Sequence, residues 1–340
     1  MRRRIEYLVR RAAGRRPPFI LMYHRIADIA CDPWELAVSP ERFAQQIEVV
    51  VRTRRPIPLA QLAEGRAPDG AIAITFDDGY IDMLVHAKPV LEKFNCPATV
   101  FIPTGLIGRR RDFWWDELTR LLLEEPELPQ NLHLLVEGRG AFRWEGGTLG
   151  GENRAALHHR LWTWLLPLPD ELRRHCLDEL ARQIGASTEG RDNHRAMTGE
   201  EVRLLASDLI EIGAHTVTHP ALPLLSTEEK RAEIIGSQRA CEALLGRPAR
   251  SFSYPHGMYD QESLDAVREA GFTAACTTED APVTGRARRL EMPRIHVKNW
   301  DGETFAQRMR RHFIGESRVS AFIASLRGGE RAAAQSVQPA

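Results

Sequence analysis

Two neighbouring aspartates and two distant histidines are the residues whose types and spacing could do chemistry. Asp77 and Asp78 come directly after the apolar run 71–76, within the sequence TFDDG. Two carboxylates at the end of a buried strand resist joint ionisation, so a cation beside them would remove an electrostatic penalty. His215 and His219 lie four residues apart in HTVTH. One aspartate with two histidines is a ligand set typical of a catalytic metal, and the second aspartate is then free to act as a base.

This set of residues permits metal-assisted hydrolysis. A divalent ion held by Asp78, His215 and His219 would make a bound water acidic enough to attack a carbonyl near neutral pH. The residues between the two histidines are Thr, Val and Thr, so the pattern is not HExxH and the general base must come from elsewhere. Asp77 is the candidate, because it is adjacent in sequence and the metal does not need it. Each motif alone is often structural. Their combination favours a site.

Polar residues also follow other predicted strands. Short apolar strands alternate with amphipathic helices along most of the chain, and this alternation predicts an α/β barrel. The polar residues that follow predicted strands are His24, Asp77 with Asp78, His215, and the stretch Tyr254-Pro255-His256-Gly257. In a parallel β/α barrel the carboxyl ends of the strands meet on one rim, where active sites lie. Four such coincidences are hard to obtain from structural residues alone.

The alternation stops between about residues 108 and 195. This stretch is helix-prone and rich in tryptophan, with prolines between its apolar segments, which predicts a helical inserted subdomain or lid. We therefore expect a basic N-terminal segment at 1–16, a barrel at 17–313 that carries the insertion, and a flexible C-terminal tail at 314–340.

Composition limits the kinds of partner and compartment. The chain has 340 residues with 46 basic and 46 acidic side chains, so its net charge gives no support to a nucleic-acid partner. Five scattered cysteines without a CxxC pair favour a reduced compartment. The basic start lacks a continuous apolar segment and no stretch is long enough to span a bilayer, so we predict a cytoplasmic protein. The arginine-rich segment 1–16 could still lie on an anionic membrane surface.

The motifs resemble those of a known family. TFDDG and HTVTH resemble the first two motifs of the NodB-homology polysaccharide deacetylases, carbohydrate esterase family 4, and the stretch 252–257 resembles their third motif. The resemblance covers about residues 19–313, apart from the insertion. It implies a deformed, TIM-like (β/α)7 barrel, a bound Zn²⁺ or another divalent ion such as Co²⁺, Mn²⁺ or Ni²⁺, and hydrolysis of an N-acetyl group from an amino sugar.

The resemblance also implies roles for single residues. By motif position Asp77 becomes the base, and Asp78, His215 and His219 become the metal ligands. A backbone N–H near His256 would support the oxyanion. The residues implied in substrate binding, as a wall of the groove, are Tyr254, Pro255 and His256. Trp114 and Trp115 could stack on a sugar face, although such a pair more often belongs to a core.

The chain departs from the family pattern in two places. The third motif commonly carries an arginine where this chain has Ser253, and Arg294 is the candidate to replace it in orienting the base. The fifth motif, Leu-x-x-His, supplies a general acid, and its nearest match is His296, although the spacing differs. Arg294 and His296 would share one face of a strand, so both or neither should reach the site. His24 is the second candidate for the acid or for substrate binding.

Alternative functions use the same residues differently. The leading hypothesis is deacetylation of a surface polysaccharide or its precursor, which could be lipid-linked, so the expected partner is a carbohydrate or glycolipid. A second hypothesis is hydrolysis of another linear or cyclic C–N amide on the same barrel. A third is oxygenation at non-haem iron, which the alternating βα pattern disfavours. The fourth is a catalytically degenerate module that only binds glycan, which Ser253 and the weak fifth motif would favour.

Overall fold

The structure, a computed structural model, describes residues 16–146, 153–283 and 288–314. The predicted basic segment 1–16 lies outside the described residues apart from Arg16, and so does the predicted tail 314–340 apart from the backbone of Ile314. Within the described residues, no helix combines the length and the apolar character needed to cross a membrane.

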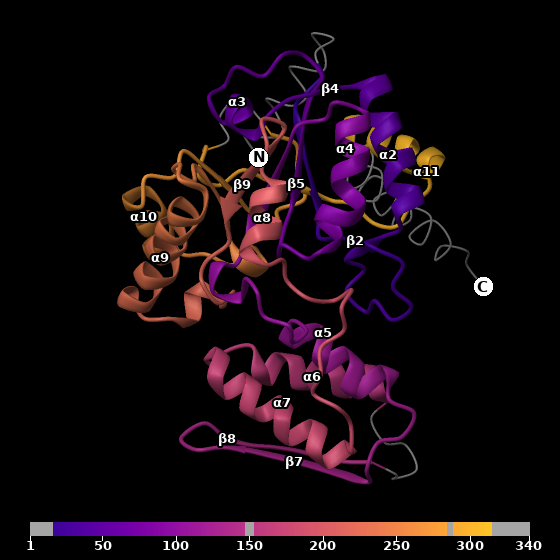
Figure 1. Cartoon of the computed structure of the whole chain (residues 1–340), viewed down its shortest axis with the longest axis vertical. Helices are drawn as coiled ribbons and strands as arrows, with labels where there is room; N and C mark the ends of the chain where they lie inside the picture. The colour runs from indigo at the N-terminus through magenta and orange to yellow at the C-terminus, as the bar shows by residue number, and fades with distance from the viewer. Residues whose placement is uncertain (1–15, 147–152, 284–287, 315–340) are drawn as a thin grey trace, which may run out of the picture.

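A curled parallel sheet forms the centre of the larger lobe (Figure 1). Its path is β12-β1-β5-β6-β9-β10-β11, and the short strand β4 (Arg55–Pro56) pairs with β5 outside this path. A parallel bridge between Cys276 and Met292 brings the two ends of the path together. The predicted deformed (β/α)7 barrel is therefore confirmed. The strands of the path are β1 (Phe19–Tyr23), β5 (Ala71–Phe76), β6 (Ala98–Ile102), β9 (Ile210–Ala214), β10 (Ser251–Ser253), β11 (Ala274–Cys276) and β12 (Ile295–His296).

Helices cover the outside of this sheet. Figure 1 shows α9 and α10 on one side and α2, α4 and α11 on the other. Side-chain caps start several of them: Ser226 and Glu229 form a capping box before α9, and Ser39 accepts from Arg42 N before α2. The helices of this lobe are α2 (Pro40–Thr53), α3 (Leu59–Ala63), α4 (Lys88–Lys93), α8 (Gly199–Leu205), α9 (Thr227–Leu245), α10 (Gln261–Glu269) and α11 (Gly302–Ile314).

The two faces of the strands carry different residues. On β1, Phe19, Leu21 and Tyr23 belong to the large cluster that packs against the helices, whereas Ile20 belongs to a second cluster with Ala73 and Phe101. Because side chains alternate along a strand, this second set fills the interior of the barrel. Both faces are buried, so the strands appear in the sequence as continuous apolar runs.

The tryptophan-rich insertion forms a second lobe with its own apolar core, drawn below the barrel in Figure 1. Its helices are α5 (Trp114–Thr119), α6 (Arg154–Leu165) and α7 (Asp170–Ile184). The insertion is helical as expected, and it also contains an antiparallel hairpin of β7 (Asn131–Val136) and β8 (Gly140–Glu145) that the sequence did not predict. The alternation of exposed and buried residues along β7 is the strand pattern that the sequence reading overlooked.

An ion pair joins Arg195 and Glu201 where the chain passes from this lobe back into the barrel. Both terminal nitrogens of Arg195 donate to Glu201 at 2.7 Å, and Thr198 N donates to the same carboxylate at 2.7 Å. The Arg195 hydrogen bonds, followed by those of Thr198, outweigh partial burial and lower the pKa of Glu201 to about 2. This pair and the capping box of α8 therefore stabilise the folded state only while Glu201 is ionised.

Replacing Glu201 with glutamine should lower the free energy of unfolding by about 1 kcal/mol near pH 7. The folded pKa lies below the unfolded value of about 4.3, so the stabilisation is present above that pH and is lost as the pH falls towards 2. Urea denaturation across this range should show parent and variant converging near pH 2. Glu200→Gln, at an exposed neighbouring position, is the control. A difference that stays constant down to pH 2 would contradict this prediction.

Candidate active site

The structure brings Asp78, His215 and His219 together. Their ligand atoms all lie within 4.8 Å of one another. Asp78 Oδ1 is 3.6 Å from His215 Nε2 and 3.3 Å from His219 Nε2. All three residues are buried. The aspartate follows β5 and the first histidine follows β9, so the rim predicted from the strand ends exists for these residues.

Unusual backbone conformations aim these side chains. Asp78, Thr216, His219 and His256 all have positive φ although none is glycine. Non-glycine residues in this region are strained and tend to occur where function requires them. Gly79 also has φ of 71°, and a Cβ there would lie 2.7 Å from Ile102 Cγ2. The chain therefore turns sharply after β5, in a space that only glycine fits.

Hydrogen bonds fix the loop that carries the histidines. His215 Nδ1 lies 2.7 Å from the Ser253 carbonyl oxygen, which can only accept, so Nδ1 carries the proton and the lone pair of Nε2 faces Asp78. Glu233 of α9 accepts from the backbone N–H groups of Val217 and Thr218 at 2.7 and 2.8 Å. The two histidines thus lie on a tight loop.

The residues present fit a divalent metal ion. Asp78 Oδ1 and His219 Nδ1 are buried and have no hydrogen-bond partner. Burial, and then the charge of Asp77, raise the pKa of Asp78 well above its ordinary value. Burial lowers the pKa of His215 and, further, that of His219, so both imidazoles are neutral near pH 7. Neutral imidazoles and a carboxylate that lacks a cation are the donors that a divalent metal requires.

Asp77 points to a different partner, the guanidinium of Arg294. Arg294 Nη1 and Nη2 donate to the two carboxylate oxygens at 2.7 and 2.6 Å. Ser253 Oγ donates to Asp77 Oδ2 at 3.3 Å and accepts from Arg294 Nη2 at 2.9 Å. Burial, the largest influence, would raise the pKa of Asp77, but Arg294, followed by His215, outweighs it and holds the pKa below its ordinary value. The Asp77 side chain is therefore an ionised carboxylate near pH 7.

Arg294 is positioned from the far side of the site. Its side chain has 0 % exposure, and its Nε donates to the Thr277 carbonyl at 2.9 Å. Its Nη1 also donates to Thr75 Oγ1 at 3.2 Å. The arginine that is missing at Ser253 is thus supplied by a residue next to β12, and the serine hydroxyl joins the same network. The residue named from the sequence as the replacement lies in contact with Asp77.

His24 and His296 lie next to each other at the edge of this network. Their ring centroids are 5.4 Å apart, both residues are partly exposed, and neither His24 Nδ1 nor His296 Nε2 has a hydrogen-bond partner. Burial lowers the pKa of His24 to about 3, with Asp77 acting in the opposite direction. We expected Arg294 and His296 either both to reach the site or both to miss it, and the structure shows only Arg294 in contact with Asp77. Arg294 touches Asp77, whereas His296 touches His24.

The third-motif residues divide into core and surface. Tyr254 has 0 % exposure, its hydroxyl donates to the Leu290 carbonyl at 3.0 Å, and its ring stacks on Tyr259. Pro255 is also buried. The expectation that Tyr254 and Pro255 line a groove is therefore wrong, because both side chains are enclosed by the barrel. His256 is partly exposed, and its ring centroid lies 4.6 Å from that of His219.

The residues on either side of the insertion match a known family. The family model for polysaccharide deacetylase matches residues 64–128 and 184–275, which include both aspartates and both histidines. The chain belongs to the polysaccharide deacetylase family. The resemblance seen in TFDDG and HTVTH is thereby confirmed.

Curated relatives agree with this family. The Bacillus subtilis (strain 168) protein named "Putative polysaccharide deacetylase YxkH" is 25% identical over 284 residues, covering 82% of this chain and 70% of that protein. A poly-β-1,6-N-acetyl-D-glucosamine N-deacetylase of Escherichia coli K12 is 29% identical over 91 residues, covering 25% of this chain and 13% of that protein.

Solved structures share the fold at low identity. The deacetylase PplD of Streptococcus pyogenes, in complex with acetate, superposes with a TM-score of 0.56 at 18% identity, covering 87% of this chain and 99% of that one. IcaB from Ammonifex degensii superposes with a TM-score of 0.56 at 18% identity, and the match covers 88% of this chain and 97% of that one.

The sequence reading of this polysaccharide deacetylase family member missed a second network beside the site. Trp115 Nε1 donates to the Tyr80 hydroxyl at 2.7 Å, and that hydroxyl donates to Asp116 Oδ2 at 2.7 Å. The Trp115 ring lies 4.8 Å from the His219 ring. Trp114 and Trp115 are only 6 % and 5 % exposed, so they belong to a core, which the sequence favoured over stacking on a sugar. They fix His219 and the core of the insertion instead.

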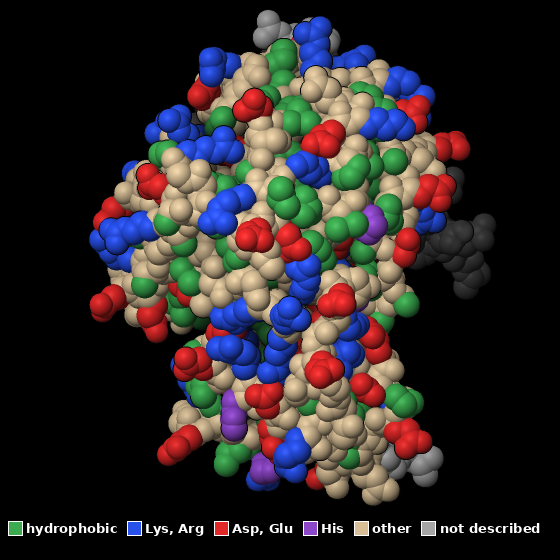
Figure 2. All heavy atoms as spheres, viewed as in Figure 1, with side chains coloured by type: hydrophobic (Ala, Val, Ile, Leu, Met, Phe, Trp, Pro, Cys, Tyr) green, Lys and Arg blue, Asp and Glu red, His purple; other side chains and the backbone are tan. Residues whose placement is uncertain are grey.

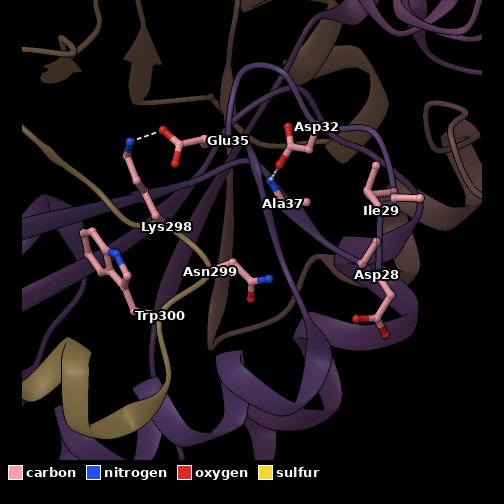
Figure 3. A pocket seen from close by; sticks show the side chains of 10 residues that line it. Asp28, Ile29, Asp32, Glu35, Ala37, Lys298, Asn299 and Trp300 are labelled. Atoms are coloured by element: carbon pink, nitrogen blue, oxygen red, sulfur yellow. Dashed lines mark hydrogen bonds and ion pairs between the residues drawn. The ribbon is translucent and has the colours of Figure 1, made fainter. Parts of the chain in front are cut away.

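Two cavities are lined by residues other than the candidate metal ligands and Asp77. One, of about 480 Å³, lies between the loop after β2 (Arg25–Ile26) and residues 298–300 (Figure 3). Its polar wall includes Asp28, Asp32 and an ion pair between Glu35 and Lys298. The other, of about 250 Å³, lies where the lobes meet, and Figure 2 shows basic side chains gathered at this junction. Its four arginines are Arg109, Arg110, Arg111 and Arg174.

Acidic side chains neutralise much of the charge at this junction. Arg109 and Arg174 both contact Asp170, at 2.8 and 3.3 Å, and Arg111 donates twice to Glu117 at 2.6 Å. These ion pairs join residues of the insertion to one another, so this cluster of arginines is largely part of a structural network within the insertion.

Proposed function

We propose that this chain is a metal-dependent deacetylase that removes an N-acetyl group from an amino sugar of a surface polysaccharide or its lipid-linked precursor. One observation carries the proposal. An ionised Asp77 lies beside the Asp78, His215 and His219 set but is bound to Arg294, so a base and a separate ligand set occur in one pocket. Family membership and the substrate in the name of the Escherichia coli relative support the choice of an N-acetylated sugar.

The metal-ligand set and Asp77 would have separate roles in this reaction. Asp78, His215 and His219 would hold Zn²⁺, or another divalent ion such as Co²⁺, Mn²⁺ or Ni²⁺. When bound, the ion supplies Lewis acidity, which lowers the pKa of a coordinated water and polarises a carbonyl oxygen. Asp77 takes the proton from the water that adds to the acetyl carbon, and Arg294 keeps the carboxylate ionised and oriented. A proton goes to the sugar nitrogen as the C–N bond breaks, which gives acetate and a free amine.

We propose that His24 and His296 relay to the sugar nitrogen the proton that Asp77 takes from the water, because burial keeps the His24 ring neutral near pH 7. Both rings carry a nitrogen without a hydrogen-bond partner, and the two rings are in contact. His24 is the member nearer to Asp77 along the sheet, since it directly follows Tyr23, whose carbonyl accepts from the Asp77 N–H at 3.0 Å. His296 lies two residues before Lys298, which lines the larger cavity. We therefore favour His24 as the group that reaches the leaving amine, with His296 behind it.

The test is release of acetate from oligomers of N-acetylglucosamine by zinc-loaded protein. A chelator should abolish release, and added zinc should restore it. The melting temperature should fall by less than about 5 °C on chelation, because two large apolar cores do not depend on the ion. Metal-loaded protein that is inert on every amino-sugar substrate offered would refute the proposal. A large fall in melting temperature would show that the ion is structural.

The alternatives differ in what they leave unexplained. A module that only binds glycan would not need Asp77 ionised, and the contact of Arg294 with Asp77 and Ser253 supports a catalytic role for this network. A hydrolase of another C–N amide would use the same residues, and a substrate panel that includes cyclic amides separates it. A cytoplasmic location remains a prediction, which the five free cysteines favour.

A further inference from the structure

Aromatic rings from both lobes form a continuous path to the candidate metal site. Trp34, from the loop between β2 and β3 (Ala37–Val38), lies 5.0 Å from Trp162 of α6 between ring centroids. Trp162 lies 5.9 Å from His256, and His256 lies 4.6 Å from His219. We propose that Trp34 and Trp162 form a stacking platform for a sugar unit next to the one whose acetyl group is removed. This inference rests on the proposed function and specifies its substrate as an oligomer.

Partial exposure separates this platform from the other tryptophans near the site. Trp34, Trp162 and His256 are each partly exposed, whereas Trp114 and Trp115 are buried. An indole offers a wide apolar face with a polar edge, which suits the C–H face of a pyranose ring and the hydroxyls around it. The exposed His159, with its ring 6.1 Å from that of Trp34, adds a polar group at the edge.

The barrel holds Trp34 on a braced turn. Glu35, the next residue, has φ of 53°, and its N–H donates to the Asp32 carbonyl at 3.2 Å. The Asp32 side chain accepts from the N–H groups of Leu36 and Ala37 at 3.0 and 2.8 Å. Lys298 forms an ion pair with Glu35 from the other side (Figure 3). A strained residue retained beside a site, with several bonds to hold it, indicates that the position of Trp34 matters.

The insertion holds Trp162 just as firmly. Its ring stacks on that of Trp114, with centroids 6.0 Å apart and an interplanar angle of 25°. The buried guanidinium of Arg173 lies 5.1 Å from the centre of the Trp114 ring. The buried His158, one turn before Trp162, contacts Thr119 at 3.0 Å. Rigid aromatic groups bind with little loss of conformational entropy, so a platform prepared in this way favours a polymer over a single sugar.

The experiment compares binding of a monosaccharide and a hexamer. The full chain carrying Asp77→Asn, loaded with zinc, is titrated with N-acetylglucosamine and with its β-1,6-linked hexamer by calorimetry. Trp162→Ala and Trp34→Ala should each weaken hexamer binding about tenfold and leave monosaccharide binding unchanged. Trp162→Phe should keep most of the hexamer affinity. Trp164→Ala is the matched control, since this partly buried residue of the same helix packs on Phe142 of the hairpin.

Each outcome decides for or against the platform. Equal weakening for both ligands, equal loss in Trp162→Ala and Trp164→Ala, or no preference of the parent for the hexamer would overturn it. A Trp162→Ala protein that fails to fold is replaced by Trp34→Ala and Trp162→Phe, which leave the core of the insertion intact. If the hexamer depends on Trp162 but no acetate is released, the proposed function fails and the platform stands. If acetate is released and neither its release nor hexamer binding depends on these tryptophans, the proposed function stands and the platform fails.

Discussion

Replacing Asp77 with asparagine should lower the rate of acetate release by about 10²- to 10⁴-fold, the range expected for loss of a general base. Asparagine keeps the shape of the side chain but cannot accept the proton of the attacking water. The ligand set of Asp78, His215 and His219 is untouched, so bound zinc should stay at the parent level. The measurements are kcat from acetate release and zinc content from elemental analysis.

The control for this variant is Asp78→Asn, the neighbouring carboxylate. It should lose zinc as well as activity, because it removes one of the three candidate ligands. If Asp77→Asn loses zinc to the same extent as Asp78→Asn, then Asp77 is a ligand and the division of roles is wrong. If Asp77→Asn keeps most of its activity, another group serves as the base.

Replacing Arg294 with leucine should lower the free energy of unfolding by about 3–5 kcal/mol. The guanidinium has 0 % exposure and makes two hydrogen bonds to Asp77, so its removal leaves a buried carboxylate without its counter-charge. Urea denaturation followed by circular dichroism measures the change. Adding Asp77→Asn to the same chain should recover part of the loss, since the buried charge is then gone.

An exposed pair of the same chemistry provides the control. Arg268 and Asp265 form an ion pair on α10 in which the two side chains are 59% and 56% exposed. Arg268→Leu should change the free energy of unfolding by less than about 1 kcal/mol. Similar losses in Arg268→Leu and Arg294→Leu would contradict the view that burial makes the Asp77 pair important.

The parts of the site that could be predicted from sequence are those fixed by local signals. An apolar strand that ends in Asp77-Asp78-Gly79 places both carboxylates at the rim before any long-range contact is known. The same holds for His215 after β9. Arg294 could be named because the family motif calls for an arginine that Ser253 does not supply, although only the closed sheet brings it to Asp77.

The parts that could not be predicted depend on contacts between distant segments. The family motif implies that Tyr254 lines a groove. In the structure its hydroxyl donates to the Leu290 carbonyl, and the ring is buried in the core. Which of His24 and His296 lies nearer to the leaving amine depends on side-chain packing, and the spacing of residues in the sequence does not determine that packing. The contact of Trp34 with Trp162 joins a barrel loop to the insertion, and the alternating pattern of neither segment points to the other.

The separate core of the inserted lobe has a consequence for how such proteins diversify. Its leucines and tryptophans pack mainly against one another, while the carboxylates and imidazoles are held by the barrel. The parts of the lobe away from Trp115, which packs on His219, can therefore change while the hydrolytic residues stay in place. Under our proposal that Trp34 and Trp162 bind a neighbouring sugar, glycan selectivity and reactivity would then vary as separable traits.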